Sequence, residues 1–131
     1  AATDRRERLE AASKAIHAHE QMLAEKMISG SGNLRGLRDI PGVSIIGGAD
    51  NGHREGVASF SLAGQPSEAI VDFLNQRGVR THTRKADHYS GNVLQPLGLS
   101  DCVRVSFSHY NTEQEVAQFL TALNDFVEQA A

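Results

Sequence analysis

With 131 residues, 40% of them hydrophobic, the chain is long enough to form one domain with a buried core. Its formal net charge of −3 leaves no basic field, so nucleic acid is a poor candidate partner, and no apolar run is long enough to span a bilayer. No signal peptide is visible, and the single cysteine, Cys102, excludes an internal disulfide framework and fits a reducing cytoplasm. Because the first residue is not methionine, we consider a processed or excised piece of a longer protein.

The first predicted element is a long helix over residues 4–29. Apolar residues recur three and four positions apart and form one stripe, whereas charged residues fill the other faces. His17 and His19 point in different directions on such a helix, so they do not share a metal, and we interpret them as packing or surface residues. The residues of the stripe are Leu9, Ala12, Ile16, Leu23 and Met27.

Short strands and a second helix are predicted for the middle of the chain. After the glycine-rich end of the first helix, residues 34–40 are predicted to form a helical turn. Residues 43–46 and 56–62 are predicted as strands, separated by a polar surface loop. The second helix begins at Pro66, since the missing N–H of proline costs nothing at the first helical position, and Gly78 ends it.

Two further predicted strands, over residues 78–85 and 101–107, each carry one arginine on a polar face. If these strands are neighbours, Arg80 and Arg104 point at one anion. A planar guanidinium binds a carboxylate or phosphate through two parallel hydrogen bonds. The alternative interpretation is two solvated arginines on an exposed sheet face.

A polar, irregular segment over residues 83–91 follows the first arginine strand. Polar loops held by rigid elements are frequent locations of functional sites, so we treat this region as a possible active-site loop. Its basic residues add positive charge, and His88 and Tyr89 offer protons or hydrogen bonds. The alternative is a mobile surface loop. The candidates are His82, Arg84, Lys85, His88 and Tyr89.

The last helix starts with a capping box from Thr112 to Glu115 and has a broad apolar face. The order helix, strand, strand, helix, strand, loop, strand, helix predicts an α+β fold, in which three helices pack on a small, mostly antiparallel sheet. Phosphate-cradling loops, dinucleotide fingerprints, nucleophile elbows and metal-ligand spacings are not found in the sequence. We interpret Cys102 as a buried, unreactive thiol.

Several short segments occur in an order and spacing that together resemble a known family. They are AIHAHE at 15–20, LRDIPGV at 37–43, GVASF at 56–60, GVRT at 78–81, VRVS at 103–106 and YNT at 110–112. The chain resembles the C-terminal small domain of the fold-type I, pyridoxal-phosphate-dependent class V aminotransferases, in particular their cysteine desulfurase-like members. The resemblance covers nearly the whole chain.

The resemblance implies that residues 1–131 form a single small C-terminal domain of a homodimeric enzyme that acts on amino acids, which the cysteine usage places in the cytoplasm. It implies that Arg104 grips the α-carboxylate of the substrate and that Arg80 is a second active-site arginine. The large domain that mainly binds pyridoxal phosphate would be absent from this chain. Since neither Lys14, Lys26 nor Lys85 matches the Schiff-base lysine, we expect the isolated chain to be catalytically silent.

One departure from the family concerns the loop after the first arginine strand. Cysteine desulfurases carry a His-Cys pair there, and the cysteine takes the persulfide, whereas this chain has Lys85 near that place. We therefore expect an aminotransferase, lyase or epimerase rather than a persulfide-forming desulfurase. Two alternatives remain: a non-catalytic module that binds a small carboxylate, and a structural dimerisation domain.

Overall fold

The computed structural model describes residues 4–131, and it confirms the predicted α+β class. None of the helices in that range is long and apolar enough to cross a membrane. In chain order the elements are α1 (Arg5–Ser29), β1 (Gly30–Ser31), β2 (Leu34–Arg35), η1 (Leu37–Asp39), β3 (Val43–Ile45), β4 (Val57–Leu62), α2 (Ser67–Gln76), β5 (His82–Lys85), α3 (Gly91–Leu94), η2 (Gln95–Leu97), β6 (Asp101–Ser106) and α4 (Glu113–Ala130).

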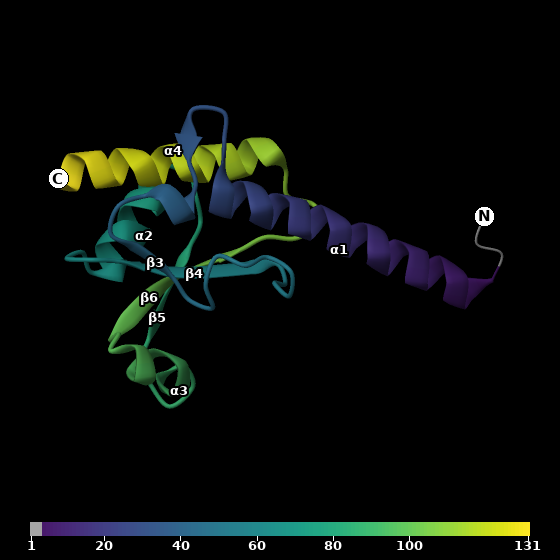
Figure 1. Cartoon of the computed structure of the whole chain (residues 1–131), viewed down its shortest axis with the longest axis horizontal. Coiled ribbons are helices and arrows are strands. Elements are labelled where there is room, and N and C mark those ends of the chain that lie inside the picture. Colours follow the sequence, from purple (N-terminus) through teal and green to yellow (C-terminus); the bar gives the residue numbers. More distant parts are fainter. Residues whose placement is uncertain (1–3) are drawn as a thin grey trace.

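A four-stranded antiparallel sheet in the order β3-β4-β6-β5 is the centre of the fold. Successive side chains of a strand point to opposite faces, so Phe60 of β4 and Val103 of β6 are fully buried on the same face. Helices α1, α2 and α4 bring their apolar residues into the same core, and the rings of Phe60 and Phe119 meet edge to face, with centroids 6.2 Å apart. Figure 1 shows these helices gathered on one side of the sheet.

The segment after α1 differs from the prediction of a helical turn over residues 34–40. Strands β1 and β2 form a small antiparallel hairpin, and only η1 is helical. The hairpin brings two backbone segments so close that a Cβ at Gly36 would collide with the N atom of Gly30 and the carbonyl O of Ile28. This close approach depends on glycine, and it ends the helical path.

The first arginine strand is shorter than predicted. Pairing with β6 begins only at His82, because the backbone before it is bound to α2 instead. The N–H of Val79 donates to the carbonyl of Leu74 (2.9 Å), and the N–H of Thr81 donates to the side chain of Asn75 (3.2 Å). Arg80 therefore lies just before β5, in the connection to α2.

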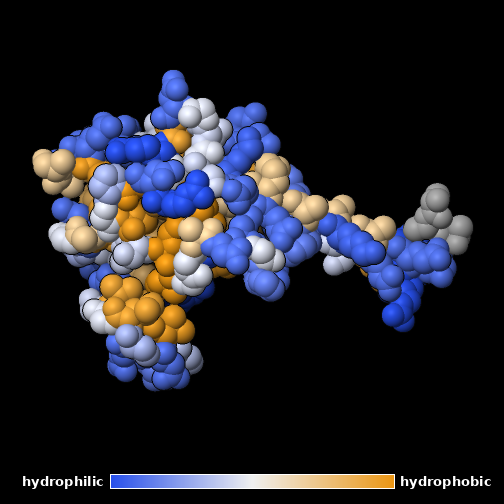
Figure 2. All heavy atoms as spheres, viewed as in Figure 1, coloured by the Kyte–Doolittle hydropathy of each residue, from blue (hydrophilic) through white to orange (hydrophobic). Residues whose placement is uncertain are grey.

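The N-terminal half of α1 projects away from the rest of the molecule (Figure 1). Residues 5–18 are exposed over about 20 Å of helix, and Figure 2 shows them largely coated with hydrophilic side chains. Leu9 is 60% exposed and Ile16 is 38% exposed, whereas Leu23 is fully buried. The predicted apolar stripe is thus buried only at its C-terminal end.

We predict that alanine substitutions along this stripe have very different costs. Leu23→Ala should lower the free energy of unfolding by about 2–5 kcal/mol, because it opens a cavity in the core. Leu9→Ala, on the projecting part of the same helix, should change it by less than about 0.5 kcal/mol. Urea unfolding followed by circular dichroism measures both values, and equal losses would contradict the described packing.

Candidate functional site

A pocket of about 550 Å³ opens where the start of β5, the end of β6 and the start of α4 meet. Its wall includes apolar core residues, but three basic side chains also line it. Arg80 comes from the α2–β5 connection, His82 from β5 and Arg104 from β6. Both predicted arginines therefore line one pocket.

Arg104 has an unusual environment for a charged residue. It lies between the buried residues Val103 and Val105 on β6 and points to the opposite face of the sheet. Its Nε is buried and has no hydrogen-bond partner, and within residues 4–131 its side chain makes no ion pair. An unpaired buried donor on a charged group is costly, so this guanidinium is well suited to an anionic ligand.

The position of Arg80 is determined by the end of α2. Gly78 has a positive φ of 78°, a conformation that glycine adopts readily, and it turns the chain sharply towards the pocket. The tethers of Val79 and Thr81 to α2 then hold the backbone on both sides of Arg80. The side chain itself is exposed, and among the described residues it has no hydrogen bond or ion pair.

Of the five loop candidates, only His82 lines the pocket. Lys85 is paired with Asp101 in the β5–β6 register and bonds Glu68 of α2 at 2.8 Å, so it points to the helix-covered face of the sheet. The hydrogen bond and charge of Glu68 raise the pKa of Lys85 above its ordinary value. Arg84, His88 and Tyr89 are exposed and lie outside the pocket.

The segment after β5 is more regular than the predicted loop. Asp87 accepts hydrogen bonds from the backbone N–H groups of Tyr89 and Ser90, and these bonds lower the pKa of its carboxyl group. The N–H of Ala86 donates to the carbonyl of Ser100, which closes the base of the segment. His88 and Tyr89 place their ring centroids 4.0 Å apart at its surface.

Three further residues of the pocket wall come from the turn before α4 and from the first turn of that helix. Tyr110, Asn111 and Glu115 line the pocket, and the carboxylate of Glu115 accepts hydrogen bonds from the Thr112 N–H and the Asn111 side chain. These bonds lower the pKa of Glu115 and complete the predicted capping box. The YNT motif signals this turn, although no role was assigned to its residues.

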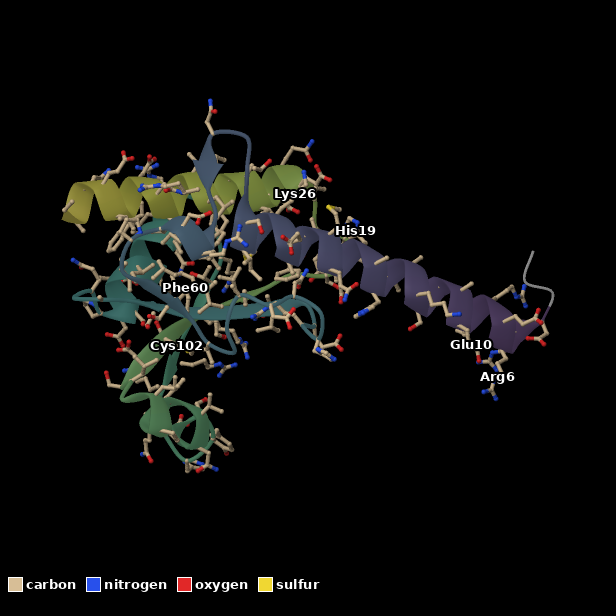
Figure 3. The ribbon with its side chains drawn as sticks, viewed as in Figure 1. Arg6, Glu10, His19, Lys26, Phe60 and Cys102 are labelled. Atoms are coloured by element: carbon tan, nitrogen blue, oxygen red, sulfur yellow. The ribbon has the colours of Figure 1, made fainter. Side chains whose placement is uncertain are left out.

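Two residues of α1 bind this turn and the first residue of α4. The ring Nε2 of His19 lies 2.8 Å from the carbonyl O of Asn111, and Lys26 Nζ lies 2.7 Å from a carboxylate oxygen of Glu113. Figure 3 shows His19 and Lys26 on the part of α1 that lies beside the start of α4. His19 is thus a packing residue, as interpreted from the sequence, and it supports one wall of the pocket.

Cys102 is buried, which confirms that part of its predicted character. Burial raises the pKa of its thiol, and the charge of Asp101 adds to this effect, whereas Arg84 and Arg104 partly oppose it. Within residues 4–131, no group of three or more His, Cys, Asp or Glu side chains is arranged to hold a metal ion.

None of the lysines in the described range lines the pocket. Lys26 is paired with Glu113, Lys85 is paired with Glu68, and Lys14 lies on the exposed part of α1. The pocket therefore offers guanidinium groups for an anion but no amine for an imine. The fold and the pocket together define a small α+β domain with a candidate anion-binding site.

Comparisons with known proteins identify the family. The model of the family described as Aminotransferase class-V matches residues 8–119. A probable cysteine desulfurase of Mycolicibacterium paratuberculosis is 39% identical over 95 residues, which are 72% of this chain and 13% of that protein. Probable cysteine desulfurase 1 of Mycobacterium leprae is 34% identical over 113 residues, 86% of this chain and 17% of that protein. The chain belongs to the aminotransferase class-V family.

A solved structure shows the same fold. The apo structure of a cysteine desulfurase from Thermococcus onnurineus matches with a TM-score of 0.77 and 24% identity, and the match covers 88% of this chain and 27% of that one. The chain thus corresponds to about a quarter or less of these relatives' length. The predicted family resemblance and fold class are both confirmed.

We predict that Cys102 is unreactive in the folded chain. Iodoacetamide should alkylate it about 10-fold more slowly, or slower still, than in urea-unfolded chain, because reaction requires local opening and its raised pKa lowers the thiolate fraction. The rate is measured by mass spectrometry at pH 8, with Cys102→Ser as the blank. Equal rates in the folded and unfolded chain would contradict the burial.

Raising the pH should also weaken the fold through this thiol. A group whose pKa is higher in the folded chain contributes its full stability below its unfolded pKa, here near 9.0, and loses it as pH rises through the folded value. Above about pH 9, the free energy of unfolding of the wild type should therefore fall relative to that of Cys102→Ser. Urea unfolding at pH 7 and pH 10 measures it.

Proposed function

We propose that this chain is the substrate-carboxylate-binding small domain of a pyridoxal-phosphate-dependent enzyme that acts on amino acids. The observation that carries this proposal is the buried, unpartnered Nε of Arg104 in the pocket wall. Membership of the aminotransferase class-V family supports the cofactor class. Arg104 binds the α-carboxylate and orients the amino acid, and Arg80 is a second arginine of the same pocket.

Catalysis in this proposal needs a larger domain that this chain does not supply. The relatives are several times longer, and no lysine of this chain lines the pocket. Pyridoxal phosphate, held mainly by that domain, acts as the electron sink for the amino acid. The isolated chain is then inactive. Leu9 and Ile16 on the projecting part of α1 are apolar residues that the large domain would cover.

The full enzyme is proposed to be a cytoplasmic homodimer. The relatives carry the name cysteine desulfurase, yet this chain offers no exposed cysteine for a persulfide, since Cys102 is buried. Lys85, which stands near the place of the loop cysteine in cysteine desulfurases, is paired with Glu68. We therefore favour a transferase or lyase reaction over persulfide-forming desulfuration. The single cysteine, which excludes an internal disulfide, agrees with a reducing compartment.

A second candidate function is a module that binds a small carboxylate, or a dimerisation domain, without catalysis. The observation in its favour is that Arg80, His82 and Arg104 of this chain already line one pocket. Purification of the native polypeptide separates the two candidates. A larger polypeptide whose aldimine absorbance changes on adding amino acids supports the enzyme, whereas a colourless chain of this length with no partner supports the module.

In the full enzyme, Arg104→Ala should weaken substrate binding and turnover by about 2–5 kcal/mol while leaving the bound cofactor largely intact. The reason is that the substitution removes a clamp on a desolvated carboxylate. Steady-state kinetics and the cofactor absorbance measure the two effects. Arg84→Ala, an exposed arginine outside the pocket, is the matched control. Loss of cofactor with unchanged substrate affinity would contradict the assigned role.

A separate prediction concerns persulfide chemistry. After incubation of the full enzyme with cysteine and blocking with an alkylating reagent, peptide mass spectrometry should find no persulfide on Cys102. Burial keeps its thiolate from reaching a substrate sulfur. A persulfide on Cys102 that disappears in Cys102→Ser would overturn the preference for other reactions.

A further inference from the structure

The pocket contains more positive charge than one carboxylate requires. One guanidinium is sufficient to bind a carboxylate through two parallel hydrogen bonds. The wall nevertheless carries Arg80, His82 and Arg104, and none of these side chains makes a hydrogen bond or ion pair within the described residues. Among residues 4–131 the one acidic residue in the wall is Glu115, and its carboxylate is engaged by the cap of α4. The three basic side chains of the pocket wall therefore lack an anionic partner within the described residues.

The three basic residues come from two segments: Arg104 from β6, and Arg80 and His82 from the start of β5 and the connection before it. His82 and Arg104 are Cα partners in the β5–β6 pair, so their Cβ atoms lie on one face, about 5 Å apart. Arg80 lies two residues before His82, in the α2–β5 connection, and it lines the same pocket. A second acidic group, a few bonds from the first, would meet His82 and Arg80. The pocket, at about 550 Å³, has room for such a ligand.

We propose that the ligand of this pocket carries two acidic groups, as in an amino acid of the aspartate or glutamate type. Arg104 binds one carboxylate, and Arg80 together with His82 binds the second. His82 and Arg80 are then specificity-determining residues. This inference rests on the proposed function, because it takes Arg104 as a carboxylate clamp. It differs from the arrangement in which both arginines bind a single carboxylate.

The test compares two ligands of nearly the same shape, glutarate and its monomethyl ester, which differ by one negative charge. Each is titrated into the 131-residue chain at low salt, and binding is followed by 1H–15N chemical shifts. Glutarate should bind about tenfold more tightly than the ester. A factor of about two is statistical, because glutarate has two carboxylates, and a factor of about five comes from two exposed contacts to the second carboxylate. Contacts of this kind are weak individually, so the informative quantity is the ratio of the dissociation constants of the ester and of glutarate.

Three variants assign the effect to residues. Arg80→Gln and His82→Gln should each lower the ratio part of the way towards about two, the statistical value, because each removes one of the two contacts to the second carboxylate. Arg84→Gln removes the same charge as Arg80→Gln from a neighbouring position outside the pocket, so it should leave the ratio unchanged. An equal loss in Arg84→Gln would mean diffuse surface attraction and would overturn the inference.

The experiment also separates this inference from the proposed function. If both ligands bind alike and Arg104→Gln weakens both, the carboxylate clamp stands and the second subsite is wrong. If neither ligand binds up to about 100 mM, or if Arg104→Gln changes neither affinity, the clamp itself is wrong and the second subsite with it.

Discussion

The antiparallel pairing of β6 with β4 and β5 is the constraint on which the candidate site depends. Alternation along β6 buries Val103 and Val105 in the core, and the same geometry turns Arg104 to the other face. A slip of one residue would exchange these faces and bury the guanidinium among apolar residues. The free energy of burying two valines therefore also holds the arginine at the pocket, with no need for a dedicated support.

The remaining walls of the pocket depend on helix ends. The C-terminal end of α2, with Gly78 and the tethers of Val79 and Thr81, carries Arg80. The capping box of α4 holds Glu115, and His19 of α1 binds the turn before it. Three helices that share one core thus meet at the pocket, so a rigid scaffold presents a polar site.

Much of this arrangement was predictable because it is encoded locally. The capping box from Thr112 to Glu115 and the alternation around Arg104 need only neighbouring residues, and both predictions are confirmed. The ion pair of Lys85 was not predictable, because its partner Glu68 belongs to another element, α2. The extent of β5 was missed for a similar reason, since Asn75 of α2 binds the backbone that was assigned to the strand.

The sequence by itself determined the α+β class, the family resemblance and the two arginines as the residues of interest. These follow from periodicity, caps and motif order, which are properties of contiguous segments. Only the tertiary structure decided that Arg80, His82 and Arg104 share a pocket while Arg84 and Lys85 stay outside it. The reason is that strand register and the packing of α2 decide where each side chain lies across and along the sheet, and neither is a local property.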